Sequence, residues 1–243
     1  MSTLADDADL AARLAEAGGR IAIAVRSSRA FAGPALGDAG DAIVNAFLTR
    51  ALREQRPADG LLSEEGRDTA ARLARSRTWI IDPVDGTNEY AEGRDDWAIH
   101  VALSADGAPV VGAVALPARG LVLRSDQPAP LSPLPSRPRM VVSRSRPARE
   151  AGRVAEAIGA QTIALGSAGA KAMAVVLGEA DVYLHSGGQH EWDSCAPVAV
   201  ALAHGLHCSR LDGSPLRYNQ RDTRLPDLLI CHPELAPAVL GAL

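Results

Sequence analysis

The stretch from Trp79 to Tyr90 constrains the fold more than any other part of the chain, because it combines a strand, a tight turn and a helix start in immediate succession. It runs Trp-Ile-Ile-Asp-Pro-Val-Asp-Gly-Thr-Asn-Glu-Tyr. The apolar, β-prone residues at its beginning predict a short strand. Pro83 fixes φ and lacks an N–H group, so we expect it to end the strand and turn the chain. Thr87 or Asn88 is then predicted to cap the next helix.

Two carboxylates, Asp82 and Asp85, leave the predicted strand within this turn. The turn can bring them to one point, facing the N–H groups of the helix start. Paired carboxylate oxygens attract Mg²⁺ and free helix-start N–H groups attract phosphate, so the arrangement indicates metal-assisted phosphate chemistry. The alternative is an Asx-turn in which the aspartates only cap. A spacing of three residues favours metal ligands over the Asp-Xaa-Asp-Gly-Thr pattern of aspartyl-phosphate enzymes.

Three further acids have open roles on the residues alone. Asp41 begins an apolar, helical pattern that ends before Pro57, so an N-cap and a functional role are equally supported. Leu61–Glu65 predicts a short strand that ends in two acids, which by itself is typical of a solvated turn. Asp193 opens another apolar helix, where an N-cap is again the simplest interpretation.

The sequence Asp-Pro-Val-Asp-Gly-Thr resembles the signature of the inositol monophosphatase superfamily of lithium-sensitive, magnesium-dependent phosphatases. The stretch from Trp192 to Pro197 is similar to the second signature of that superfamily, Trp-Asp-Xaa-Xaa-Ala-Gly, with Pro197 in place of the glycine. The resemblance extends from Asp41 to about Asn219. It implies an α/β (α+β) fold, a layered αβαβα sandwich with an N-terminal α+β half (1–126), a C-terminal α/β half (139–243) and an active site between them.

The resemblance also implies roles for particular residues. Two or three Mg²⁺ ions would be held by four carboxylates and one backbone carbonyl, those of Glu64, Asp82, Asp85, Asp193 and Val84 respectively. Thr87, hydrogen-bonded to Asp41 or Glu64, would orient the attacking water. The N–H groups of Gly86 and Thr87 would bind the phosphate. No phosphoenzyme is then expected, and Li⁺ is expected to inhibit by taking one Mg²⁺ site.

Segments of the C-terminal half are similar to the 3′(2′),5′-bisphosphate nucleotidase branch, the CysQ type. Ser143-Arg144-Ser145 and the small residues from Gly166 to Lys171 would line a nucleotide pocket, with Lys171 facing a second phosphate. Tyr218 could stack on a base, although core packing fits it equally well. The implied reaction converts 3′-phosphoadenosine 5′-phosphate to AMP and phosphate in sulfate assimilation. Inositol 1-phosphate and fructose 1,6-bisphosphate are alternative substrates, and a non-catalytic metal- or phosphate-binding regulator is a remote alternative.

The rest of the chain shows patterns that predict helices, strands and connecting segments. Residues 4–29 form an amphipathic helix capped by Thr3, and the glycine-rich segment 30–40 is predicted to be a loop. The β-rich runs 97–103 and 110–116, with a possible third at 121–123, indicate an antiparallel sheet. A proline-rich linker, 127–138, precedes strands and helices that alternate as in an α/β layer. In this layer, strands are expected at 140–142, 161–165 and 181–184, and helices at 148–158, 168–177 and 193–203.

Composition restricts the possible partners. The net charge is −4 without a basic run, so neither nucleic acid nor an anionic membrane surface is expected as a partner. The acidic first residues lack the pattern of a secretory signal, and three isolated cysteines indicate reduced thiols in a cytoplasmic protein. The histidines form no metal-binding pattern, and none is assigned a role. A homodimer is possible by analogy with the superfamily.

Overall fold

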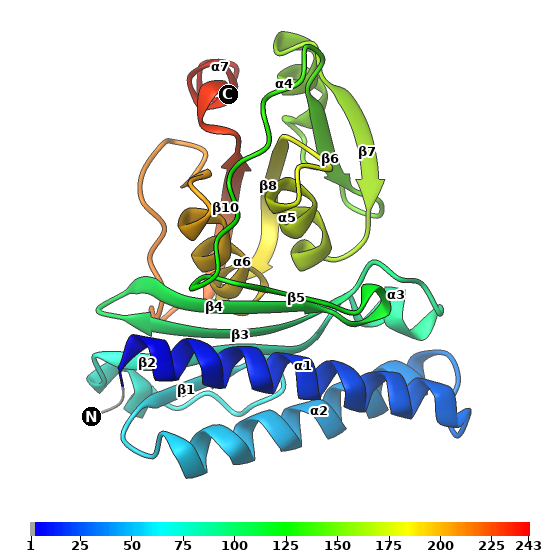
Figure 1. Ribbon diagram of the computed structural model, residues 1–243, viewed down its shortest axis with the longest axis vertical. Coiled ribbons are helices and arrows are strands. Elements are labelled where there is room, and N and C mark those ends of the chain that lie inside the picture. Colours follow the sequence, from blue (N-terminus) through cyan, green and yellow to red (C-terminus); the bar gives the residue numbers. More distant parts are fainter. Residues whose placement is uncertain (1–2) are drawn as a thin grey trace.

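The computed structural model describes residues 3–243. These residues form five stacked layers (Figure 1). Figure 1 shows α1 and α2 beneath a first sheet, α5 and α6 between this sheet and a second one, and α4 and α7 on the far side. The predicted αβαβα sandwich is therefore confirmed. Every strand of the first sheet precedes the segment 127–138, and every strand of the second follows it. The division into halves 1–126 and 139–243 stays a prediction, because the core between the sheets draws residues from both.

The first helix, α1 (Leu4–Ser28), has the predicted extent and cap. Thr3 Oγ1 accepts a hydrogen bond from the Asp6 N–H group at 3.2 Å, and the Asp6 carboxylate accepts one from the Thr3 N–H group at 2.9 Å. These two bonds form a reciprocal capping box, which satisfies N–H groups that the helix cannot pair internally.

The second helix, α2 (Pro34–Gln55), begins earlier than predicted. The segment 30–40 is mostly helical, and Asp41 lies inside the helix, so the predicted loop and the N-cap role of Asp41 are both wrong. Pro34 is well suited to the first turn. Gly37 and Gly40 allow α2 to pack closely against α3. An added Cβ would lie 2.8 Å from Thr87 Cγ2 at Gly37 and 2.6 Å from Tyr90 Cε1 at Gly40.

The first sheet has the strand order β1-β2-β3-β4-β5. β1 is parallel to β2, and the remaining pairs are antiparallel, as predicted for the segments after residue 97. The strands are β1 (Gly60–Ser63), β2 (Arg77–Asp85), β3 (Ala98–Ala105), β4 (Ala108–Leu116) and β5 (Leu121–Arg124), with the 3₁₀ helices η1 (Ala70–Ala74) and η2 (Pro117–Arg119).

β2 does not end at Asp82, contrary to the sequence prediction. It continues through Pro83 to Asp85, with a shift of register against β3 between the two aspartates. The helix that follows, α3 (Thr87–Ala91), has Gly86 as its N-cap residue, with a φ of 87°, so neither Thr87 nor Asn88 caps it. Glycine fits here because side-chain-bearing residues rarely adopt a positive φ.

The second sheet has the order β7-β6-β8-β10-β9. β7, β6 and β8 are parallel, and β10 is antiparallel to both of its neighbours, β8 and β9. The sequence did not predict β9 and β10. Its strands are β6 (Arg139–Ser143), β7 (Gln161–Leu165), β8 (Val182–His190), β9 (His207–Ser209) and β10 (Arg224–Cys231). Its helices are α4 (Ala151–Ala157), α5 (Ala168–Val176), α6 (Glu191–Ala203), η3 (Pro233–Leu235) and α7 (Ala236–Gly241). The segment 127–138 contains no helix or strand, as expected of a linker.

α6 joins the two sheets, because it packs directly on the first one. An added Cβ at Gly112 of β4 would lie 2.5 Å from the Ala196 carbonyl oxygen and 2.7 Å from Ala199 Cβ. The sheet and the helix are therefore so close at this point that only glycine fits at position 112. Within the described residues, no helix is both long and apolar enough to cross a membrane.

This close contact predicts the effect of a single methyl group. Gly112→Ala should lower the free energy of unfolding by about 1–3 kcal/mol, because the Ala196 carbonyl oxygen belongs to a helix backbone that cannot move independently. Gly152→Ala in α4 is the matched control, since nothing lies within 4 Å of its added Cβ. Thermal unfolding of both variants measures the difference. Equal melting temperatures would show that α6 does not pack as described.

Candidate active site

A cavity of about 440 Å³ is lined by residues from both sides of the segment 127–138. Its lining includes most of the residues singled out from the sequence, namely Glu64, Asp82, Val84, Asp85, Gly86, Thr87, Ser143, Arg144, Gly166, Lys171 and Asp193. Asp41 and Tyr218 are absent from this lining. The volume is within the usual range of roughly 300–1,000 Å³ for ligand pockets.

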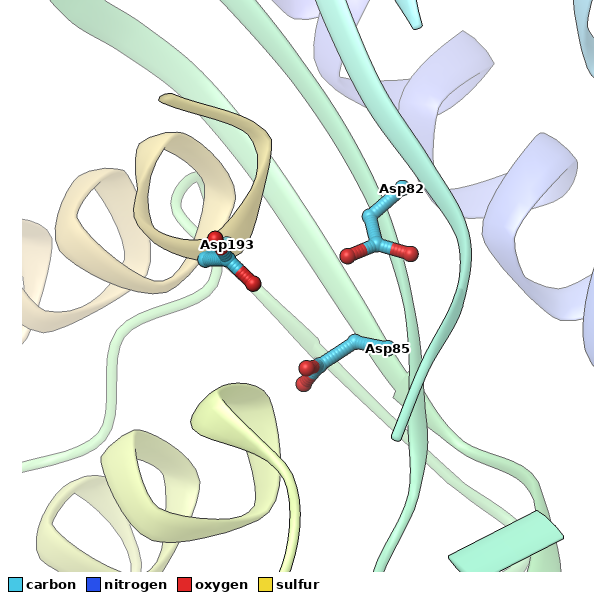
Figure 2. Close-up of side chains that lie close together, drawn as sticks. All are labelled: Asp82, Asp85 and Asp193. Carbon is cyan, nitrogen blue, oxygen red and sulfur yellow. The ribbon is translucent and has the colours of Figure 1, made fainter. Parts of the chain in front are cut away.

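Three aspartates converge on one end of this cavity. Asp82 and Asp85 come from β2 and Asp193 from α6, and each offers a carboxylate oxygen within 4.8 Å of the others. Figure 2 shows the three side chains pointing toward a common space. Residues three apart in a regular strand face opposite sides. The register shift between Asp82 and Asp85 is a bulge that turns both to the same side.

The carboxylate of Asp85 is held by the start of α5. Its Oδ1 accepts a hydrogen bond from the Ala168 N–H group at 3.2 Å and its Oδ2 one from the Gly169 N–H group at 2.5 Å, both at the start of α5. His100 Nε2 lies 3.3 Å from Oδ2. Burial opposes ionisation of Asp85, but the charge and hydrogen bond of His100 and the Gly169 N–H group outweigh it and lower its pKa.

His100 is a site residue that the sequence interpretation missed. Its ring is fully buried, and Nδ1 lies 3.0 Å from the Trp192 carbonyl oxygen, directly before Asp193. It therefore bridges the two elements that carry the aspartates. His100 pairs with Asp82 across β2 and β3. A polar residue on the same strand face as Ala98 and Ala102 was the signal that could have identified it.

The buried acids carry unpaired oxygens. Asp82 is 1% exposed, and neither its Oδ1 nor Asp41 Oδ1 has a hydrogen-bond partner among the described residues. Burial, then the charges of Glu64 and Asp85, raise the pKa of Asp82 well above its usual range. Buried carboxylates are normally paired with cations or bind metals. The acidic end of the cavity is therefore suited to hard divalent cations, which neutralise such a cluster.

Asp193 and Glu64 complete the acidic end. Asp193 lies in the first turn of α6 rather than at its N-cap, and its Oδ2 accepts a hydrogen bond from the His190 N–H group at 2.6 Å. Burial and then Asp85 raise the pKa of Asp193 to about 6. Glu64 is an exposed residue, but partial desolvation of its carboxyl group and the charge of Asp193 raise its pKa to about 7.

Asp41 acts on the cavity through Thr87. The Thr87 hydroxyl lies 2.9 Å from Asp41 Oδ2 and 3.1 Å from the Val84 carbonyl oxygen, and it can donate its proton to either. One hydroxyl proton serves both acceptors, so the oxygen of Thr87 remains free to accept a hydrogen bond. The early start of α2 places Asp41 behind Thr87, where it is 5% exposed.

The segment from Gly166 to Lys171 forms one wall of the cavity. The Lys171 ammonium group is buried, and it donates to the carbonyl oxygen of Gly166 and, at 2.7 Å, to that of Ser167. Burial lowers its pKa to about 8. Lys171 thus holds the loop with two of its three protons. Gly166 is packed against Glu89, which leaves no space for a side chain.

Ser143 and Arg144, at the end of β6 and in the turn that follows it, also line the cavity. The Arg144 guanidinium group is paired with Asp96 and with Glu89, the latter at 3.4 Å. Ser143 Oγ accepts a hydrogen bond from the Arg146 N–H group at 3.2 Å, which shapes the turn that follows β6.

Tyr218 is not available to stack on a base in this cavity, so that prediction does not hold. Its side chain is fully buried, and its hydroxyl lies 3.2 Å from Ser194 Oγ on α6. The neighbouring residues instead anchor the helix that carries Asp193. Glu191 accepts hydrogen bonds from the N–H groups of Asn219 at 2.6 Å and Gln220 at 2.7 Å.

Comparison with known proteins identifies the family. A family model described as the inositol monophosphatase family matches residues 35–242. The chain belongs to the inositol monophosphatase family. It is 52% identical over 236 residues to a 3′-phosphoadenosine 5′-phosphate phosphatase of Mycobacterium tuberculosis, covering 93% of this chain and 88% of the relative. It is also 50% identical over 252 residues to the protein of the same name from Mycobacterium leprae, with coverage of 98% and 93%.

The solved structures agree on the fold of this family. The chain superposes on CysQ from Bacteroides thetaiotaomicron, described as a bacterial member of the inositol monophosphatase family, with a TM-score of 0.83. The two share 23% sequence identity, and the alignment covers 93% of this chain and 97% of the CysQ chain.

The crowded acids predict an unusual pH dependence of the metal-free protein. Burial raises the pKa of Asp41 to about 7, so folding favours its protonated form. The resulting stability is present below pH 4 and is lost as the pH rises toward 7. In the presence of a chelator, Asp41→Asn should therefore be more stable than the wild type at pH 7.5, by roughly 1–3 kcal/mol.

Thermal unfolding between pH 4 and 8 measures this effect. The control is Asp38→Asn, which changes an exposed aspartate of the same helix and should depart from the wild-type curve much less than Asp41→Asn, because the charge of Asp38 is only the last of the causes that raise the pKa of Asp41. An Asp41→Asn variant that is less stable than the wild type at pH 7.5 would show that the carboxylate stabilises the fold, contrary to the expectation.

Proposed function

We propose that this protein is a Mg²⁺-dependent phosphatase that hydrolyses 3′-phosphoadenosine 5′-phosphate to AMP and phosphate. The observation that carries the proposal is the convergence of Asp82, Asp85 and Asp193 on one cavity. The high identity to relatives named for this activity, over almost their whole length, supports the choice of substrate. A place in sulfate assimilation is part of the proposal.

The proposed metal ligands are the carboxylates of Glu64, Asp82, Asp85 and Asp193 and the carbonyl of Val84, which would hold two or three Mg²⁺ ions. When bound, such ions lower the pKa of a water molecule and neutralise phosphate oxygens. The unpaired oxygen of Asp82 and the raised pKa values of Glu64 and Asp193 support this assignment, because a cation relieves the mutual repulsion. Inhibition by Li⁺ is proposed from the resemblance.

The residues of the chain then orient the reactants. Asp41 fixes the Thr87 hydroxyl, whose free lone pair accepts a hydrogen bond from the attacking water. The Gly86 and Thr87 N–H groups, with Ser143, Arg144, Gly166 and Lys171 along the wall, are proposed to position the substrate. The water oxygen forms a bond to phosphorus, the bond to the 3′ oxygen breaks, and the departing oxygen gains a proton. No protein nucleophile takes part.

A cytoplasmic location and a homodimer remain predictions. The three cysteines are free, with Cys195 and Cys231 buried, as expected of reduced thiols.

Three substrates assayed side by side test the proposal. Phosphate release from 3′-phosphoadenosine 5′-phosphate, inositol 1-phosphate and fructose 1,6-bisphosphate is measured with Mg²⁺, with and without Li⁺. We expect a kcat/KM for the nucleotide at least a hundredfold above the others, about 2.7 kcal/mol of differential transition-state binding. Comparable rates would indicate a generalist pocket. No Mg²⁺-dependent release from any of them would favour a non-catalytic regulator.

The role of Thr87 predicts a difference between two small substitutions. Thr87→Val removes the hydroxyl and should lower kcat by roughly 100-fold, because the water loses an orienting partner. Thr87→Ser retains the hydroxyl and should retain most of the activity. Steady-state kinetics on 3′-phosphoadenosine 5′-phosphate separates the two. A large loss in Thr87→Ser with Thr87→Val close to the wild type would instead assign the effect to the methyl group that packs against Gly37.

A further inference from the structure

The cavity is lined by acidic and by basic side chains. Besides the converging aspartates, its lining includes the basic residues Arg144, Arg146, Lys171 and His185. A substrate with two separate phosphate groups needs a partner for the group that is not hydrolysed. One of the basic residues must supply that partner, since the carboxylates repel an anion unless cations are bound to them.

Two of these basic residues are already used by the protein. Arg144 is paired with Asp96 and Glu89, so a phosphate would have to displace carboxylates to reach it. Lys171 is 3% exposed and donates to the carbonyl oxygens of Gly166 and Ser167. Both residues shape the wall of the cavity, and both have most of their hydrogen-bonding capacity occupied.

His185 is no more available. Its Nε2 lies 2.7 Å from the Gly187 carbonyl oxygen, which can only accept, so this nitrogen carries the proton. Burial lowers the pKa of this ring, and so do the nearby cations Lys171 and Arg146. Together they outweigh the hydrogen bond to Gly187, which raises the pKa. A neutral imidazole contributes little to the binding of an anion.

Arg146 differs from the other three. It is exposed at the cavity, and its guanidinium group has no ion pair or hydrogen bond to any residue that the structure describes. Its backbone N–H group bonds to Ser143 Oγ, which anchors the base of the side chain. Its Nη1 lies 3.6 Å from the Cβ position of Gly188. Gly187 and Gly188, with φ values of 78° and 80°, leave this space open.

We propose that Arg146 binds the phosphate group of the substrate that is not hydrolysed, and thereby makes the enzyme prefer a nucleoside bisphosphate to a monophosphate. The inference rests on the proposed function and adds a specificity-determining residue to it. A guanidinium group binds phosphate through two parallel hydrogen bonds. Because Arg146 has no carboxylate partner, no ion pair has to break before it binds.

The test compares two substrates that differ in one phosphate group. The kcat/KM values for 3′-phosphoadenosine 5′-phosphate and adenosine 3′-monophosphate are measured for the wild type, Arg146→Gln and Arg146→Lys. We expect the wild type to prefer the bisphosphate, and Arg146→Gln to reduce the ratio of the two values by about 10- to 100-fold, mainly through KM for the bisphosphate. Arg146→Lys should restore part of the ratio, since it retains the charge but not the two-pronged geometry.

Arg149→Gln is the matched control, because it removes an exposed arginine three residues away that does not line the cavity. Its ratio should equal that of the wild type. An unchanged ratio in Arg146→Gln, or a wild type without preference for the bisphosphate, would overturn the inference while leaving the phosphatase activity in place. Failure of the wild type to hydrolyse either nucleotide would instead overturn the proposed function.

A binding measurement gives a readout that does not depend on turnover. Titration calorimetry with Mg²⁺ compares AMP, which has only the 5′-phosphate, with adenosine. The wild type should bind AMP more tightly, and Arg146→Gln should weaken AMP binding by about 10- to 100-fold without a similar effect on adenosine. Equal AMP affinities in the wild type and Arg146→Gln would contradict the proposed contact, whatever the kinetic result.

Discussion

The mutual repulsion of carboxylates in one cavity is the constraint on which the rest of this structure depends. Asp82, Asp85 and Asp193 cannot all be charged at such short range unless something compensates them. The chain supplies part of that compensation by directing the start of α5 and the ring of His100 at Asp85. A cation bound to the remaining oxygens would relieve the rest of the repulsion.

The layered architecture is what makes such a cluster possible. Asp82 and Asp85 come from β2 of the first sheet, and Asp193 comes from α6, which packs on that same sheet. Gly112 allows the close approach of α6. Glu191, two residues before Asp193, is fixed by the N–H groups of Asn219 and Gln220, and Arg72 bonds to both of these residues from the first half. The packing of α6 on the first sheet thus brings Asp193 close to Asp82 and Asp85.

Local patterns predicted much of this arrangement. The acids around Pro83, the layer order and the strand at 161–165 followed from periodicity, turn chemistry and motif resemblance. The start of α2 did not, because Gly37 and Gly40 read locally as loop residues, although their role is contact with Thr87 and Tyr90. His100 was missed because its partners, Asp85 and Trp192, are distant in sequence. The opposite error concerns Tyr218. It was predicted as a residue that stacks on a base, but its side chain is buried in the core.

The hydrogen bonds between Asp85 and the start of α5 also bear on how the protein is made. During synthesis the N-terminal half leaves the ribosome first, and its acidic turn must wait for residues 168 and 169 before the Asp85 carboxylate has its partners. The sheet face around Gly112 waits longer still, until α6 emerges. A nascent chain therefore exposes an apolar sheet face until α6 covers it, so chaperones can act on its folding at that stage.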